Sequence, residues 1–131
     1  MKKIKIKNNI VLNDFNVSVN PYLTYAQIQH IANEVCKFDS WAERQQNIDL
    51  LLLHYVTDIT DEEINEYGHE LLLQSGLIDA VKKNVSNLKQ IYKAIDYTQS
   101  TQRMFQQVLK EMPKYINSIK EVGLNGIKRK E

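Results

Sequence analysis

The residues best suited to chemistry lie in a helical pattern between Glu66 and Glu70. His69-Glu70 matches the start of the zinc-binding motif His-Glu-x-x-His, but position 73 is Leu, so the second histidine is missing. Glu66 and His69 form one Glu-x-x-His pair, a spacing that di-iron helix bundles use twice, together with two further glutamates. The sequence has no second pair of this kind. We therefore predict no metal site and no bound cofactor.

Other catalytic arrangements are also incomplete. His54 and Asp58 could share one helix face, but a histidine near a helix end beside an acid has an ordinary structural explanation. The acids from Asp58 to Glu63 lack the alternating spacing, the central glycine and the final glutamate of a calcium-binding EF-hand loop. No Ser-His-Asp spacing, glycine-rich phosphate loop or paired-cysteine metal site occurs. The sequence predicts a protein that is not an enzyme.

Composition and charge exclude several further classes. The 131 residues are 43% hydrophobic and 25% charged, which is typical of one globular domain. Seventeen basic against sixteen acidic residues give a net charge of +1, too neutral for a general nucleic-acid binder. The longest apolar run is four leucines, far short of the ~20 residues of a membrane span, so no membrane partner is expected. The single Cys36 cannot form an internal disulfide, and its spacing predicts core packing.

The first 20 residues predict a small antiparallel β element. Apolar residues alternate with lysines from Lys3 to Lys7, and the charged lysines should protect that strand edge from pairing. Asn8-Asn9 suits a tight turn, after which Ile10–Leu12 would pair back. A third extended piece, Phe15–Val19, ends before Pro21.

After Pro21 the chain reads as helices. Capping boxes pair Thr24 with Gln27, Ser40 with Glu43 and Thr60 with Glu63, and each directly precedes apolar residues at helical spacing. Gly76 and Gly123 are expected to end helices, and Ser86 is expected to begin one. Pro113 either ends the fifth helix or lies in the first turn of the last one. The expected helices are 25–37, 41–57, 61–74, 77–84, 87–112 with a break allowed at 98–102, and 114–122.

The predicted fold class is therefore mainly α. We expect a single domain over residues 1–131, in which the β element of residues 1–20 precedes a bundle of five to six helices over residues 24–122. Residues 123–131 are expected to form a mobile basic tail.

Aromatic and basic residues suggest where a partner could bind. The chain has seven tyrosines and one tryptophan, residue types that favour interfaces but also suit the edges of a core. Tyr92 and Tyr97 adjoin a polar helical segment and are the pair expected to be exposed. Lys128, Arg129 and Lys130 in the tail could also contact a partner, although a solvated terminus is the expected state. These five residues are the predicted interaction surface.

One segment carries a family resemblance. Asp49 followed by apolar residues, Tyr55–Glu63, Ser75–Val81 and later Val108 to Pro113 resemble a family of small uncharacterised proteins encoded in phage and prophage genomes of Gram-positive hosts, near virion structural genes. The resemblance covers roughly residues 44–122, and the first 40 residues depart from it. It implies a non-enzymatic phage protein that binds other proteins in virion assembly or as a virion component. The expected location is the host cytoplasm or the virion.

Two other functions fit the same features. A phage-encoded inhibitor of a bacterial defence system, of the anti-CRISPR type, would also be a small chain without a catalytic motif. It would form a stoichiometric complex with a host effector and be absent from purified virions. A nucleic-acid-associated regulator is the third reading, which a salt-dependent affinity for duplexes would support.

Overall fold

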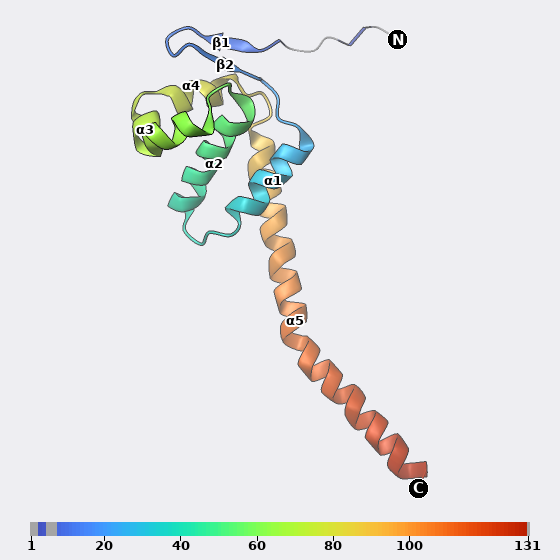
Figure 1. Cartoon of the computed structure of the whole chain (residues 1–131). Coiled ribbons are helices and arrows are strands. Elements are labelled where there is room, and N and C mark those ends of the chain that lie inside the picture. Colours follow the sequence, from blue (N-terminus) through green and yellow to red (C-terminus); the bar gives the residue numbers. More distant parts are fainter. Residues whose placement is uncertain (1–2, 5–7, 131) are drawn as a thin grey trace. The chain divides into compact units, whose positions relative to one another are not determined.

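The computed structural model is mainly α-helical, with 70% of residues in helices and a small two-stranded antiparallel sheet near the N-terminus (Figure 1). This confirms the predicted fold class. The structure describes residues 3–4 and 8–130, with side chains as far as residue 120. The chain divides into two compact units, residues 1–98 and 99–131. The boundary falls inside the polar segment 98–102, but the last helix (Lys89–Lys130) runs through that segment without the break that the sequence allows.

The sheet is a short hairpin. Strand β1 (Ile10–Leu12) pairs antiparallel with β2 (Val17–Val19), and Ile10 lies opposite Val19. The connecting turn contains Asn16 at φ 52°, a left-handed conformation that asparagine tolerates better than most residues. The turn predicted at Asn8-Asn9 is therefore wrong, because those residues precede β1 and the chain reverses at residues 13–16. Residues 5–7 of the predicted first strand lie outside the described part.

Backbone hydrogen bonds attach the hairpin to the helices. The Asn20 amide donates to the carbonyl of Val56 over 2.7 Å, and the Asp58 amide donates to the carbonyl of Ser18 over 3.3 Å. The Asp58 carboxylate accepts the Ser18 amide at 2.9 Å. Asp58 thus continues the sheet pairing past β2 and does not pair with His54. Val19 beneath these bonds is fully buried.

Four helices follow in the first unit: α1 (Tyr25–Val35), α2 (Trp41–Val56), α3 (Asp61–Gln74) and α4 (Leu77–Asn84). Their first residues agree with the prediction from the sequence, and α3 and α4 agree at both ends. The hairpin lies over α3 and α4, and the start of α5 (Lys89–Lys130) lies beside α1 (Figure 1). Apolar faces converge on one core, which also takes in Ile91 and Ile95 of α5. Its fully buried members include Leu23, Ile31, Val35, Ile48, Leu52, Leu53, Ile78 and Val81.

Two of the three predicted capping boxes are present. Thr24 and Thr60 each accept the amide of the third helical residue, and the Gln27 and Glu63 side chains accept the cap amides in return. Ser40 sits at the start of α2 but makes no side-chain capping bond, so the third box is wrong. The loop before α2 is stabilised instead by the buried Arg44, whose guanidinium donates to the carbonyl of Phe38 at 2.5 Å and lies 5.2 Å from the Trp41 ring centre.

This difference gives a first prediction. Thr60→Ala should lower the free energy of unfolding by about 1 kcal/mol, because it removes the oxygen that satisfies the Glu63 amide. Ser40→Ala removes the same kind of hydroxyl from a helix start where it makes no capping bond, and should change stability by less than about 0.5 kcal/mol. Urea unfolding of both variants measures the difference, and equal losses would contradict the assignment.

Helix α3 is not regular. Gly68 adopts φ 78° and ψ 159°, which breaks the helical path in the middle of the element. The sequence predicts one uninterrupted helix here, and that expectation is wrong. Only glycine reaches this backbone region without strain, so Gly68 places the residues on either side of it on separate helical segments.

Helix α5 spans Lys89–Lys130. It begins later than predicted because Ser86 and Asn87 bind the chain before α1: the Ser86 hydroxyl donates to the Pro21 carbonyl at 2.9 Å. The Asn87 side chain pairs with both backbone groups of Leu23, at 3.0 and 2.9 Å. The helix continues through Pro113 and residue 123, so both predicted ends are wrong. Helix-forming residues surround these positions, and a proline removes only one amide donor and crowds one carbonyl.

Candidate functional site

A buried polar cluster joins three helices of the first unit. Asp49 of α2 has a side chain only 2% exposed, and it accepts from Lys82 of α4 at 2.6 Å and from His69 of α3 at 2.8 Å. Gln45, one turn earlier on α2, donates to the same carboxylate at 3.0 Å. No side-chain nitrogen or oxygen buried in the described residues lacks a hydrogen-bond partner. The cluster therefore acts as a polar tie between α2, α3 and α4.

The kink at Gly68 explains how His69 reaches this cluster. Glu66 is exposed, whereas His69 is only 17% exposed and binds Asp49, so the two residues of the Glu-x-x-His pair have different surroundings. Among the described residues, no three histidine, cysteine or acidic side chains are placed to hold a metal ion. The sequence singled out His69, but not its partner Asp49, which lies twenty residues earlier.

The polar tie extends to one predicted interaction residue. The Tyr92 hydroxyl donates to Gln45 Oε1 at 3.3 Å, and its ring packs against the core. The expectation that Tyr92 is exposed is therefore wrong. Tyr97, one and a half turns later, is 73% exposed as predicted. The two tyrosines do not share one surface.

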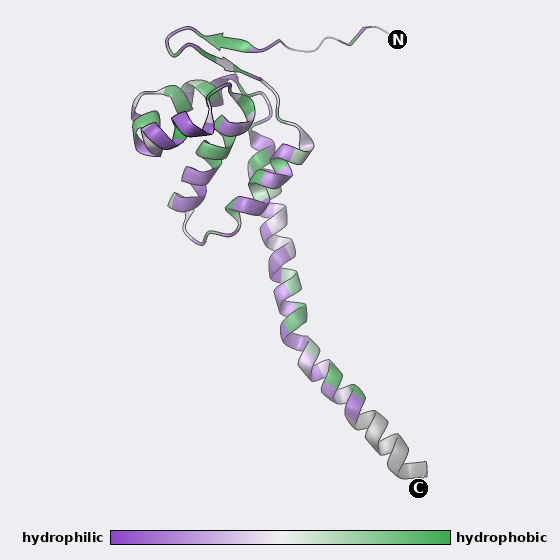
Figure 2. Ribbon diagram, viewed as in Figure 1, coloured by the Kyte–Doolittle hydropathy of each residue, from purple (hydrophilic) through white to green (hydrophobic). Residues whose placement is uncertain are grey.

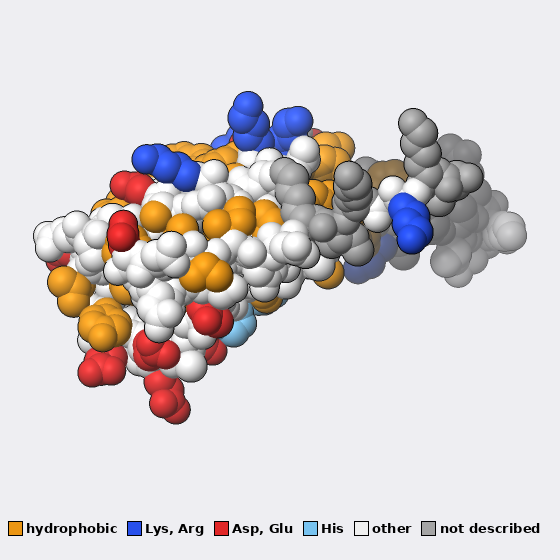
Figure 3. Space-filling model, turned by 90° about the horizontal axis from the view of Figure 1, so that it is seen from above, with side chains coloured by type: hydrophobic (Ala, Val, Ile, Leu, Met, Phe, Trp, Pro, Cys, Tyr) orange, Lys and Arg blue, Asp and Glu red, His pale blue; other side chains and the backbone are white. Residues whose placement is uncertain are grey.

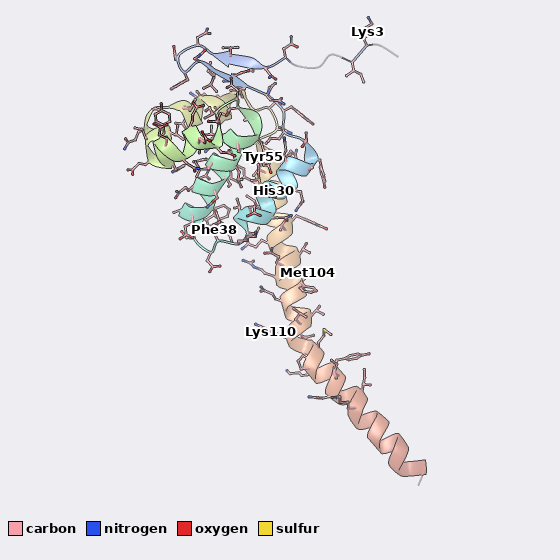
Figure 4. The ribbon with its side chains drawn as sticks, viewed as in Figure 1. Lys3, His30, Phe38, Tyr55, Met104 and Lys110 are labelled. Atoms are coloured by element: carbon pink, nitrogen blue, oxygen red, sulfur yellow. The ribbon has the colours of Figure 1, made fainter. Side chains whose placement is uncertain are left out.

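A second group of rings lies on the exposed side of α1 and α2. His30 and Tyr55 lie side by side (Figure 4) and are hydrogen-bonded, with their ring centres 5.7 Å apart. The rings of His54 and Tyr55 meet edge to face, with their centres 5.0 Å apart. His54 Nδ1 lies 2.6 Å from the carboxylate of Asp61. The sequence suggested Asp58 for this contact. The His30 and His54 side chains are 50% and 46% exposed. The group joins α1, α2 and the start of α3.

Two side chains at the end of α1 have perturbed pKa values. A hydrogen bond from Lys37 at 2.9 Å lowers the pKa of the exposed Glu34 carboxyl. Burial raises the pKa of the Cys36 thiol, which donates to the carbonyl of Ile95 over 3.7 Å and packs against the core as predicted.

The Cys36 environment predicts slow thiol chemistry. Because the raised pKa leaves less thiolate at pH 8, iodoacetamide should modify the folded protein more slowly than the urea-unfolded chain. The rate should keep rising to a higher pH in the folded state than in the unfolded state. Mass spectrometry of quenched samples across pH gives both profiles. Coincident profiles would show that burial does not control this thiol.

Tyr97 borders a cavity of about 400 Å³ in the first unit. We call it the tyrosine pocket; Tyr22 and Tyr25, which are 62% and 85% exposed, lie on it together with Lys93. The other lining residues are Leu23, Ile28, Gln29, Asn87, Gln90 and Ala94. Sequence reasoning missed Tyr22 and Tyr25, because nothing in a single tyrosine's sequence context distinguishes a core edge from a pocket rim.

A second hollow of about 340 Å³ lies between the hairpin and α3. Phe15 and Val17 form one side, and Tyr67 and Leu71, both about half exposed, form the other. Seen from above, acidic side chains gather along one edge of the molecule, with apolar side chains beside them (Figure 3).

The second unit is a single helix, and it carries a row of exposed apolar side chains. Hydrophobic and hydrophilic residues alternate along it (Figure 2). Eight apolar side chains are between 43% and 70% exposed, and we call them the helix stripe. They are Met104, Phe105, Val108, Leu109, Met112, Tyr115, Ile116 and Ile119. The sequence shows apolar residues at helical spacing here, and the structure leaves all eight outside the core.

The remaining predicted interaction residues, Lys128, Arg129 and Lys130, have side chains outside the described part. In the described residues, no helix combines the length and the apolar character needed to cross a membrane. No protein-family model matches this sequence, and no curated protein or solved structure is significantly similar to it.

Proposed function

We propose that this chain is a non-enzymatic phage protein that binds another protein during virion assembly or within the particle, and that the helix stripe is its contact surface. The observation that carries the proposal is the row of eight apolar side chains on one helix, each at least 43% exposed.

Exposing such a row of apolar side chains to water costs free energy unless a partner buries it. Soluble proteins rarely expose contiguous apolar patches larger than a few hundred Å², and larger ones mark interaction sites. Pro113 adds to this argument, since a proline inside a helix costs ~3 kcal/mol and most helical stability comes from packing an apolar face. A partner that buries the stripe would therefore also stabilise the helix.

The phage context comes from the resemblance of residues 44–122, and the polar tie around Asp49 supports a binding role over catalysis. Lys82 and His69 both bind the Asp49 carboxylate, and Asp49 lines neither the tyrosine pocket nor the hollow between the hairpin and α3. The polar tie therefore stabilises the packing of α2, α3 and α4 and has no free group for a reaction.

The test is made in the phage or prophage that carries the gene. Deletion should reduce infectious particles, and mass spectrometry should find the protein in particles or assembly intermediates. Complementation with Val108→Lys/Met112→Lys should fail, because two charges enter the centre of the stripe. Gln107→Lys/Asn117→Lys adds the same charges to the opposite face of the helix and should restore particles.

Two results would contradict this function. Normal particles after deletion, with the protein absent from them, would remove the assembly role. A stoichiometric complex with a host defence protein would then support the inhibitor reading. Equal behaviour of the two double variants would instead remove the helix stripe as the contact surface.

A further inference from the structure

We infer that the partner covering the helix stripe is the same helix of a second copy of this chain, so that the protein self-associates through residues 104–119. This inference rests on the proposed function, because it names the first occupant of the same surface. Three properties of the stripe support it: its repeat, the position of its charges and its area.

The first property is a seven-residue repeat. Ile91, Thr98, Phe105, Met112 and Ile119 follow one another at intervals of seven in the sequence. Ile91 and Thr98 are buried within the first unit, whereas the last three are 63%, 45% and 55% exposed. Residues repeating at this interval come together when helices pair along their length. The repeat residues of the second unit are therefore exposed, whereas those of the first unit are buried in its core.

The neighbouring heptad positions complete the face. Val108 and Tyr115 occupy the position three residues after each repeat residue, and Leu109 and Ile116 the position after that. At 100° per residue the eight side chains span about 140° of the helix. Apolar residues at three of seven positions are typical of helices in a bundle, whereas a two-stranded coiled coil needs only two. The stripe is wide enough to contact one or more equivalent helices.

The second property is the placement of charge. The second unit carries seven basic and three acidic residues, so two copies would repel if these charges met. On the same helical projection, however, Arg103, Lys110 and Lys114 point away from the stripe. Glu111 borders one side of the stripe and Lys120 the other. Two copies can therefore bring their stripes together without placing like charges in contact.

The third property is area. At the observed exposures the eight side chains offer on the order of 100 Å² each, or roughly 800 Å² together, and a stable interface covers about 800 Å² on each partner. No charged residue lies within the stripe, so pairing would leave no buried charge without a counter-ion. A second copy supplies a surface of matching length, width and polarity.

Sedimentation equilibrium of the full chain tests the inference. We expect a concentration-dependent oligomer at micromolar concentrations. Val108→Lys/Met112→Lys should raise the dissociation constant by about a hundredfold or more, since each buried anchor contributes a factor of ten or more. Gln107→Lys/Asn117→Lys should leave it nearly unchanged. Circular dichroism of the isolated variants shows whether the helix itself survives the substitutions.

A labelling experiment covers the case in which the charged variant unfolds. In a Cys36→Ser background, alkylation of Met112→Cys should slow as the protein concentration rises, while alkylation of Asn117→Cys should not. Slow labelling that does not depend on concentration would place the stripe against its own chain and overturn the inference.

A monomer at all concentrations up to millimolar would also overturn self-association. The proposed function would survive that outcome if Val108→Lys/Met112→Lys still abolished particle production and Gln107→Lys/Asn117→Lys did not. An oligomer in solution combined with normal particles after gene deletion would have the opposite meaning: self-association would stand and the assembly role would fall.

Discussion

Lys82→Met is expected to lower the free energy of unfolding by about 2–4 kcal/mol, one of the two largest effects of any single substitution considered for this chain. The Asp49 carboxylate is 2% exposed and lies 2.6 Å from the Lys82 ammonium. Removing the ammonium leaves a buried carboxylate with only His69 and Gln45 as partners. Because Lys82 is itself 21% exposed, the loss should fall below that of a fully buried pair.

The chain offers a matched control in the next residue. Lys83→Met changes the same residue type in the same last turn of α4, but Lys83 is exposed, so its effect should stay within about 0.5 kcal/mol. Chemical denaturation of both variants measures the difference. The double variant Asp49→Asn/Lys82→Met should lose less than the sum of its single variants, because neutralising the carboxylate removes the need for the ammonium. Strict additivity would show that the pair does not interact energetically.

Gly68→Ala is the second large effect, with an expected loss of about 1–3 kcal/mol. The sign of this effect is informative. In a regular helix, alanine would be better than glycine by about 1 kcal/mol, so the substitution would stabilise the protein. At φ 78° and ψ 159°, an alanine is strained even though no neighbouring atom lies within 4 Å of its added Cβ. The added Cβ therefore destabilises the protein through backbone strain and not through a steric clash.

The consequence of Gly68→Ala extends to the polar tie. The kink directly precedes His69, and a straightened α3 would turn that imidazole away from Asp49. We expect the chemical shifts of His69 to change more than those of His54, whose partner Asp61 lies at the unaffected start of α3. Gly76→Ala is the control for a positive φ outside this contact, since Gly76 has φ 85° and lies at the start of α4. A gain in stability for Gly68→Ala would show that the kink is not required.

Local rules explain why so many helix starts could be predicted. Thr24 and Thr60 cap helices through contacts that span only three residues, and residue 76 separates α3 from α4 by the left-handed turn expected of glycine. The same rules fail where a distant segment competes for the capping group. Ser86 and Asn87 bind Pro21 and Leu23, more than sixty residues away, so α5 starts later than its sequence indicates.

The candidate surfaces depended on distant contacts even more. Tyr92 and Tyr97 look equivalent in sequence. In the structure the Tyr92 hydroxyl donates to Gln45 on another helix, whereas Tyr97 lines the tyrosine pocket. The row from Met104 to Ile119 has the periodicity of a core helix. This periodicity shows that one face of the helix is apolar. It does not show whether that face is buried, because burial depends on which other segments pack against it.

By itself, the sequence determined the mainly helical class, four helix starts in the first unit and the small antiparallel element, because hydrophobic period, caps and turns act over a few residues. Tertiary structure alone decided that Asp49, His69 and Lys82 meet in one buried cluster and that Gly68 breaks α3. It also decided that the Tyr92 hydroxyl is hydrogen-bonded to Gln45 and that the helix stripe is exposed. The cluster and the Tyr92 contact join residues far apart in the chain, and their pairing is set by how whole helices pack and not by local propensity.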